Sequence, residues 1–368
     1  MKNVIKFLFL TVVMYSCQPE PDEPMFIIDP DLNLASPAES ELLKFPSGAT
    51  VKKMGSDYLW LGDILLSPSQ LEEVKSKGYI SGILQMSDKA VANTAVHPVT
   101  NMPLDKISGG VASVGIGGAS PAKTWAMVRY VYAPDLSPDR KQIIREAIAH
   151  WEANTNVRFY NATGQPTKHP QFGFDYPYIE FVNGTANNSY VGLIGGRQIV
   201  NLAASQAVRP AIHEIGHAIG FFHEQSEPNR DDYMNINFSN IKPEAKNNFD
   251  KISSNYFQIG SVDFNSIMMY GSNIRDTEMV YNVNIPTMTR KDGTTWEPAQ
   301  TLSSIDKMWA NRFYLPYIAR SDVYRELADV VYTPDNKIMS QEERLALQAQ
   351  LNNGNPNPPA GGRIPNIH

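Results

Sequence analysis

Residues 213 to 224 read His213-Glu214-Ile215-Gly216-His217-Ala218-Ile219-Gly220-Phe221-Phe222-His223-Glu224, and the spacing of their polar groups predicts a metal site. His213 and His217 are four positions apart, so on a helix their imidazoles lie on one face and can share a metal ion. Glu214 stands one position round the same helix, where it cannot complete the ligand set but can reach a metal-bound water. That is the position of a general base.

The third histidine requires the helix to stop. His223 lies six positions after His217, and a continuing helix would carry it roughly 240° round the axis, away from the metal. Gly220 can end the helix, because glycine enters the left-handed conformation without steric cost. Three neutral imidazoles leave a fourth zinc position for water, whose pKa falls to about 7. We therefore expect one Zn²⁺ per chain; an amphipathic core helix that happens to carry histidines is the alternative.

The pattern HExxHxxGxxH is the metzincin signature. With Phe221 before the last histidine and Glu224 after it, the stretch resembles the astacin family of zinc endopeptidases, and residues 228–233 resemble that family's continuation. The resemblance implies an α+β, metzincin-like fold of two lobes with the zinc cleft between them. The N-terminal lobe would hold a mixed twisted sheet and two long helices, and the C-terminal lobe would be irregular. The implied activity is hydrolysis of peptide bonds.

Ser266-Ile267-Met268-Met269-Tyr270 resembles the family's Met-turn. The resemblance implies that Met268 packs beneath the histidines without binding the metal. For Tyr270 it implies a phenol that approaches the zinc at rest and then hydrogen-bonds the tetrahedral oxyanion. Taken as an isolated stretch, the same five residues would simply be core.

Trp60-Leu61-Gly62-Asp63-Ile64 resembles the Phe-x-Gly-Asp segment of astacin propeptides, which implies that Asp63 occupies the fourth zinc position in a latent form. A carboxylate on zinc displaces the nucleophilic water, and covalent linkage gives it a high effective concentration. Taken alone, a Gly-Asp pair is a turn. The small residues 108–120 suit proteolysis, so we expect an activating protease to cleave there or just before. The resemblance implies that the freed amino terminus folds inward near Glu224.

The amino terminus has the shape of a signal peptide. Lys2 and Lys6 precede the apolar run Phe7 to Met14, whose eight residues are too few to span a bilayer, which needs about 20. Cys17, the only cysteine, stands where a bacterial lipoprotein would carry its lipid. We expect export and a lipid anchor at the outer membrane or cell surface; ordinary cleavage nearby, with an extracellular product, and an uncleaved anchor are the alternatives. A single cysteine excludes an intramolecular disulfide, although astacin-like domains usually carry two.

The 368 residues suffice for about two domains with real cores. A net charge of -6 argues against a nucleic-acid partner. The expected divisions are a signal peptide over 1–17, a flexible tether over 18–40, an inhibitory propeptide-like region over 41–118, an astacin-like catalytic domain over 119–316, and a C-terminal extension over 317–368 that is helical and then disordered.

Capping residues and hydrophobic periodicity predict the elements around the site. Helices are expected over Pro68 to Lys77, Pro138 to Asn154, Leu302 to Tyr314 and Ser340 to Leu351. Strands are expected over Met127 to Tyr132, Val157 to Tyr160 and Tyr178 to Val182. The glycine-interrupted run Ser189 to Leu202 resembles the family's edge-strand region, along which a peptide substrate would lie extended. Its glycines are otherwise the mark of bulges.

The favoured hypothesis is a zinc endopeptidase in which Glu214 accepts a proton from the attacking water and later delivers it to the leaving amine. One rival is a surface module that holds zinc and binds a partner without turnover. The other is a metallohydrolase that acts on something other than peptide bonds.

Overall fold

The computed structural model describes residues 40–80, 116–119, 125–168, 173, 175–254, 256–318, 326–352 and 354–357. The expected signal peptide, Cys17, nearly all of the tether, most of residues 108–120 and the last eleven residues lie outside this part of the chain. Within the described ranges, the helices all fall short of the length and apolar character that crossing a membrane requires.

The chain combines helices and strands in a mixed α+β fold. The helices are α1 (Pro68–Lys77), α4 (Pro138–Asn154), α5 (Arg209–Ile219), α6 (Ser304–Phe313) and α7 (Gln341–Leu351). The strands are β1 (Ser40–Lys44), β2 (Thr50–Met54), β3 (Asp57–Trp60), β4 (Ile64–Leu65), β5 (Ile116–Ala119), β6 (Val128–Tyr132), β7 (Phe159–Asn161), β8 (Tyr178–Asn183), β9 (Asn188–Tyr190), β10 (Arg197–Leu202), β11 (Met234–Ile236), β12 (Tyr256–Gln258), β13 (Met288–Arg290), β14 (Tyr317–Ile318) and β15 (Glu326–Leu327).

The capping residues in the sequence predicted the ends of helices α1 and α4 correctly. For α1 the predicted bounds are confirmed to the residue: Ser67 Oγ accepts from the backbone N–H of Gln70, the Gln70 side chain accepts from the backbone of Ser67, and Gly78 ends the helix at a φ of 80°. Helix α4 also has its predicted bounds, with Ser137 as N-cap. One strand is shifted: β7 begins at Phe159 rather than at Val157.

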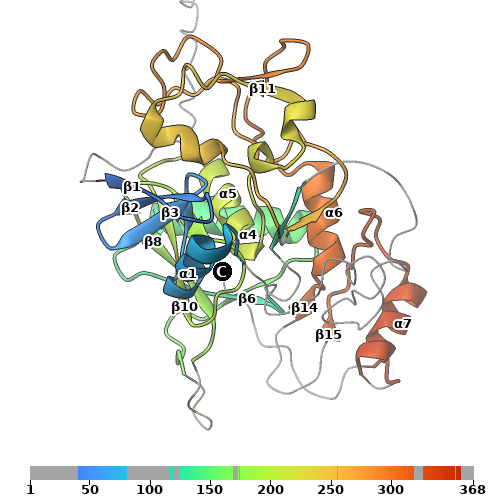
Figure 1. The fold of residues 1–368 in the computed structure, drawn as a ribbon. Coiled ribbons are helices and arrows are strands. Elements are labelled where there is room, and N and C mark those ends of the chain that lie inside the picture. Colours follow the sequence, from blue (N-terminus) through green and yellow to red (C-terminus); the bar gives the residue numbers. More distant parts are fainter. Residues whose placement is uncertain are drawn as a thin grey trace, which may run out of the picture.

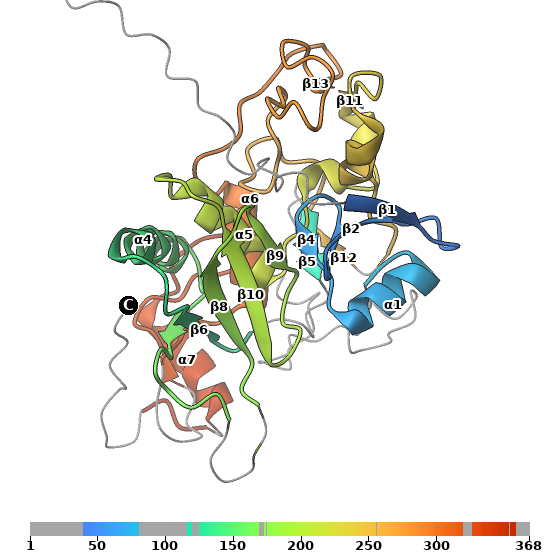
Figure 2. The ribbon, with the colours of Figure 1, turned by 90° about the vertical axis from the view of Figure 1, so that its left-hand side faces the viewer.

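Nine strands of the described residues form one sheet in the order β1-β2-β3-β4-β9-β10-β8-β6-β7. Strands β10, β8, β6 and β7 are parallel, β9 runs antiparallel to β10, and β4 pairs with β9 in parallel. Residues 40–80, which we call the leading segment, therefore extend the sheet through β1 to β4 (Figure 2).

This arrangement changes the expectation for the run from Ser189 to Leu202. Strand β9 is not a free edge here, because Ile64 and Leu65 of β4 pair with Ser189 and Tyr190. The glycines do not form bulges in a strand. Gly192, Gly195 and Gly196 lie between β9 and β10 at positive φ, where they turn the chain back.

The main core lies between the sheet and the two helices α4 and α5. It joins the apolar face of α4 (Ile144, Ile148 and Trp151) to inward-facing residues of the sheet and to Ile215 and Ile219 of α5. The Nε1–H group of Trp151 donates to the carbonyl of Ile212, 3.0 Å away, which ties the two helices together. Helix α5 is thus held in a fixed position against the sheet.

Residues 224–300 contain little regular structure, and most of them form the yellow and orange part at the top of Figure 1. They form short 3-10 turns, Glu224–Ser226, Arg230–Asp232 and Pro243–Phe249, and the small β11-β13 sheet. A separate apolar cluster, which includes Met234, Phe249, Met269 and Tyr270, holds them together.

The C-terminal residues pack on the same body. Strands β14 and β15 pair, and Leu315, Tyr317, Leu327 and Val331 form a small cluster that α7 helps to cover. The side chain of Asn156, at the end of α4, exchanges hydrogen bonds of 2.7 and 2.8 Å with the backbone of Tyr332. The predicted helix over Ser340 to Leu351 is confirmed, with Ser340 as its N-cap.

Candidate metal centre

Helix α5 and the turn after it carry the three histidines. Every residue of α5 is buried. The helix ends at Gly220, whose φ is 120° and whose N–H group donates to the carbonyls of Gly216 and His217. The chain then doubles back, and the Nδ1 atom of His217 lies 2.8 Å from the carbonyl oxygen of Phe221. The sharp stop at Gly220 brings His223 back to the face that holds His213 and His217.

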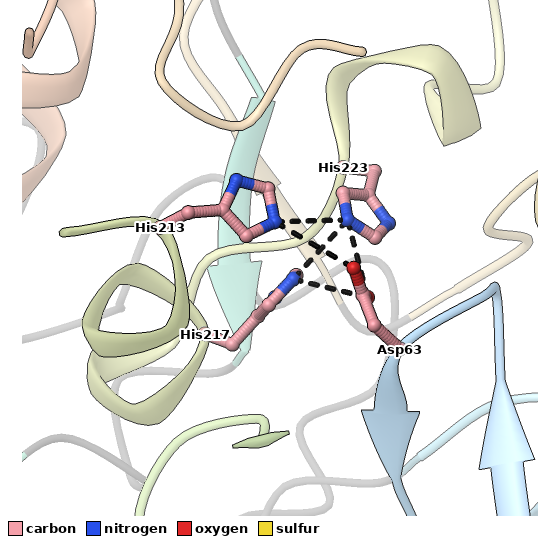
Figure 3. A group of neighbouring side chains, drawn as sticks. All are labelled: Asp63, His213, His217 and His223. Atoms are coloured by element: carbon pink, nitrogen blue, oxygen red, sulfur yellow. Dashed lines mark hydrogen bonds and ion pairs between the residues drawn. The ribbon is translucent and has the colours of Figure 1, made fainter. Parts of the chain in front are cut away.

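The three imidazoles converge through their Nε2 atoms (Figure 3). The Nε2 atom of His223 is 3.2 Å from that of His213 and 3.2 Å from that of His217. All three side chains are fully buried. Together with Asp63 they form a group whose ligand atoms all lie within 4.8 Å of one another.

These residues fit a zinc ion. The Nδ1 atoms of His213 and His217 face the carbonyls of Ile267 and Phe221 at 2.9 and 2.8 Å, so each ring carries its proton there and turns a bare Nε2 lone pair to the centre. Such lone pairs cannot hydrogen-bond one another. Tetrahedral zinc with Zn–N bonds of about 2.0–2.1 Å separates its ligand nitrogens by about 3.3 Å. Burial lowers the pKa of His213 to about 3, which keeps the ring neutral, as a metal ligand must be.

Asp63 enters the cluster from the turn between β3 and β4. Its Oδ1 atom lies 3.3 Å from His217 Nε2 and 3.2 Å from His223 Nε2, and its Oδ2 atom lies 3.7 Å from His213 Nε2. The carboxylate therefore faces the three nitrogens as a fourth donor.

The backbone beside Asp63 is tightly constrained. Leu61 has a φ of 54° and Gly62 a φ of 109°, both in the region that L side chains avoid. A Cβ atom on Gly62 would lie 2.7 Å from the hydroxyl oxygen of Tyr270. Only glycine fits between the strand and this hydroxyl, so the turn can bring Asp63 close to the histidines.

Glu214 is fully buried next to the cluster. Neither of its carboxylate oxygens has a hydrogen-bond partner among the described residues. Burial, followed by the negative charge of Asp63, raises the pKa of Glu214 well above its usual range, and the charge of Arg209 opposes this. A buried carboxyl group that lacks a protein partner is available to a water or a substrate.

Tyr270 and Met268 flank the histidines from the turn at residues 266–270. The hydroxyl of Tyr270 donates to Asp63 Oδ2 at 3.5 Å, and its ring lies 4.7 Å from that of His223. Met268 is fully buried, and a Cβ atom on Gly216 would lie 2.6 Å from its sulfur. Met268 therefore packs directly against α5 between His213 and His217.

Glu224 contacts the segment that leads into and forms the turn at residues 266–270. Its Oε2 atom accepts from the backbone N–H of Asp263 at 2.9 Å, and its own N–H donates to the carbonyl of Met268. Sequence reasoning missed two neighbours, Gln225 and Arg209. The side-chain oxygen of Gln225 accepts from the N–H of Tyr270 at 3.3 Å, and Arg209 donates to the carbonyl of Ala299 at 2.6 Å. No spacing rule pointed to either contact, because both join segments far apart in the sequence.

A family model described as Astacin, a peptidase family, matches residues 118–315, which is more than half of the chain. The chain belongs to the astacin family. This is a family of zinc metalloproteases, and zinc is the metal that the cluster of Asp63, His213, His217 and His223 could bind.

Two curated relatives illustrate the similarity. Zinc metalloproteinase nas-12 of Caenorhabditis elegans is 34% identical over 208 residues, which are 55% of this chain and 51% of that protein. Blastula protease 10 of Paracentrotus lividus is 38% identical over 151 residues, which are 40% of this chain and 25% of that protein. The chain thus spans about half or less of these relatives.

Among solved structures, the chain is similar to high choriolytic enzyme 1, a hatching enzyme zinc-protease from Oryzias latipes. The identity is 25%, with a TM-score of 0.45 over 53% of this chain and 96% of that chain. None of these comparisons tests the lipid on Cys17, which stays a prediction.

Proposed function

We propose that this astacin-family chain is a secreted zinc endopeptidase made as a latent zymogen. The observation that carries the proposal is the convergence of three buried histidines and one carboxylate from the leading segment, beside the buried Glu214, whose carboxylate has no hydrogen-bond partner among the described residues. A binding module without turnover would have no use for a buried carboxyl group that lacks a partner, since burying such a group costs free energy.

In the proposed reaction His213, His217 and His223 hold the metal through Nε2. Zinc, when bound, polarises the scissile carbonyl and lowers the pKa of the attacking water. Glu214 accepts the proton of that water at its carboxylate and passes it to the leaving amine.

Tyr270 is proposed to stabilise the oxyanion. In the latent form its hydroxyl donates to the carboxylate that faces the three histidines. Once Asp63 has left, the same hydroxyl points to the place where the oxyanion of the tetrahedral intermediate would form. Its ring stays held by contact with His223.

Latency is proposed to have two components, both contributed by the leading segment. Asp63 takes the fourth position of the metal site, and β4 pairs with β9, the strand along which an extended peptide substrate would lie. We place the substrate cleft between the sheet-bearing part and the irregular residues 224–300. Removal of residues 41–118 by an activating protease would free both the metal position and the strand, leaving a catalytic domain over 119–316.

Export and anchoring rest on the sequence of the first 17 residues. We propose that the chain is exported and held at the bacterial outer membrane or cell surface by lipid on Cys17, with residues 18–40 as tether. Mass spectrometry of the exported precursor would read the modification of Cys17, and mass spectrometry of the processed chain would read the activated amino terminus.

The decisive experiment compares the proteolytically processed chain with its Glu214→Ala variant on denatured casein, with and without a chelator. We expect the processed chain to cleave casein, the chelator to stop cleavage, and Glu214→Ala to retain one zinc ion but lose turnover. Normal cleavage by Glu214→Ala would disprove the role of Glu214. A processed chain that holds zinc and leaves casein intact would favour the binding module, or a hydrolase acting on another class of bond.

A further inference from the structure

Asp306, the third residue of α6, has contacts that reach beyond its own helix. Its side chain is 2% exposed. The Oδ2 atom accepts from the backbone N–H of Ser303 at 2.8 Å, which completes the cap of α6. The same oxygen accepts from the N–H of Ile267 at 2.9 Å, and Oδ1 accepts from the Ser266 hydroxyl at 2.6 Å. Two of the three hydrogen bonds therefore hold the turn at residues 266–270.

The other capping boxes of this chain show that capping alone does not need these contacts. In α1 the side chain of Gln70 reaches back to the backbone of Ser67, and in α7 that of Glu343 reaches back to Ser340. In α6 the shorter, buried carboxylate of Asp306 caps the helix and also accepts hydrogen bonds from residues 266 and 267, about 40 positions away. Burial raises the pKa of Asp306 to about 6, so the fold keeps this carboxylate at an energetic cost.

The turn that Asp306 holds leads directly to the metal site. The carbonyl of Ile267 lies 2.9 Å from His213 Nδ1, so Ile267 bonds Asp306 through its N–H and His213 through its C=O. The Ser266 hydroxyl also accepts from the N–H of Met268 at 3.0 Å. A hydrogen bond at Nδ1 sets the tautomer and the ring orientation of a histidine ligand.

We propose that Asp306 is a positioning residue for the metal ligand His213. By bonding the Ser266 hydroxyl and the Ile267 N–H, it holds the Ile267 carbonyl where it accepts a hydrogen bond from His213 Nδ1. The Nε2 lone pair of His213 is then directed at the metal. This inference rests on metal binding at the histidines, which the following experiment measures directly.

The test compares zinc affinity in the full-length chain and two variants, by competition with a chelator of known affinity. Asp306→Asn keeps the shape of the side chain but replaces one acceptor oxygen by a donor. It should lower zinc affinity by about 10- to 100-fold, the usual effect of losing a group that supports a ligand. Ser303→Ala is the matched control, because it removes the cap hydroxyl of α6 and leaves the Asp306 contacts to residues 266 and 267. It should lower the melting temperature and leave zinc affinity unchanged.

Replacing zinc by Co²⁺ adds a spectroscopic readout, since the visible absorption of bound Co²⁺ reports ligand geometry. The spectrum should change in Asp306→Asn and stay the same in Ser303→Ala. Unchanged affinity and spectrum in a folded Asp306→Asn chain would overturn the inference, as would an equal loss of affinity in Ser303→Ala. If Asp306→Asn does not fold, Ser266→Ala decides in its place, and wild-type affinity there would overturn the inference. A wild-type chain that binds no zinc would instead contradict the proposed function.

Discussion

The histidine stretch, residues 213–224, and the leading segment, residues 40–80, each bring ligand atoms to the same point by different physical means. The stretch positions three imidazoles with one helix and one glycine turn, all within eleven residues. The leading segment brings one carboxylate from 150 positions upstream by pairing β4 with β9. The three histidines keep their positions as long as the helix and its turn are folded. Asp63 depends on the docking of a separate segment, so cutting the chain can remove it.

The largest effect should come from breaking the stretch itself. His217→Ala removes one of three ligands, and we expect zinc to be lost and the processed chain to be inactive. The leading segment should remain docked, because its strand pairing and its apolar contacts do not involve the metal. Metal analysis together with hydrogen exchange across residues 57–66 checks both points. Release of β4 in this variant would show that the metal, and not the sheet, holds the segment.

A second variant tests the docking contact. Trp60 is 2% exposed and meets Phe222 edge to face at 6.2 Å between ring centres. Trp60→Ala should cost about 3–5 kcal/mol of packing energy and loosen the leading segment. We expect peptide cleavage by the unprocessed chain to rise. Leu42→Ala is the control, since Leu42 lies in the same segment but is 36% exposed. Equal activity in both variants would argue against docking as the basis of latency.

Gly62→Ala tests the close contact between the Gly62 backbone and the Tyr270 hydroxyl, next to Asp63. The new Cβ atom would meet the Tyr270 hydroxyl at 2.7 Å and would force a residue with a side chain to a φ of 109°. A strain of about 1–3 kcal/mol should raise the activity of the unprocessed chain about 5- to 150-fold. Gly55→Ala separates the two causes, because Gly55 also has positive φ but open space around it. The same rise in Gly55→Ala would contradict the steric explanation.

The smallest effect is expected at Gly216. A Cβ atom there would lie 2.6 Å from the sulfur of Met268, a flexible side chain that can shift by part of the distance. Gly216→Ala should therefore lower the free energy of unfolding of the zinc-free chain by about 1 kcal/mol and leave latency unchanged. Denaturant unfolding measures the first quantity, and peptide cleavage by the unprocessed chain measures the second. If the unprocessed Gly216→Ala chain gained peptide-cleaving activity, the histidine stretch and the leading segment would not act independently.

Local chemistry accounts for the elements that the sequence predicted well. Ser67 with Gly78, Ser137 and Ser340 each mark a helix end through hydrogen bonds within one turn. The spacing of His213, His217 and His223 also acts over a short range, through the period of one helix and the turn at Gly220. The strands were predicted less closely, and the pairing of β9 with β4 was not predicted at all, because no short-range energy specifies which strand lies beside which.

The sequence by itself predicted that His213, His217 and His223 share one metal ion, since helix periodicity and the glycine stop act over a few residues. Only the tertiary structure decided that Asp63 lies 3.2 Å from His223, that β4 covers β9, and that Asp306 holds the turn behind His213. These contacts join segments about 40 to 160 residues apart. Their formation depends on how the whole core packs and on the entropy of closing long loops, which no local pattern encodes.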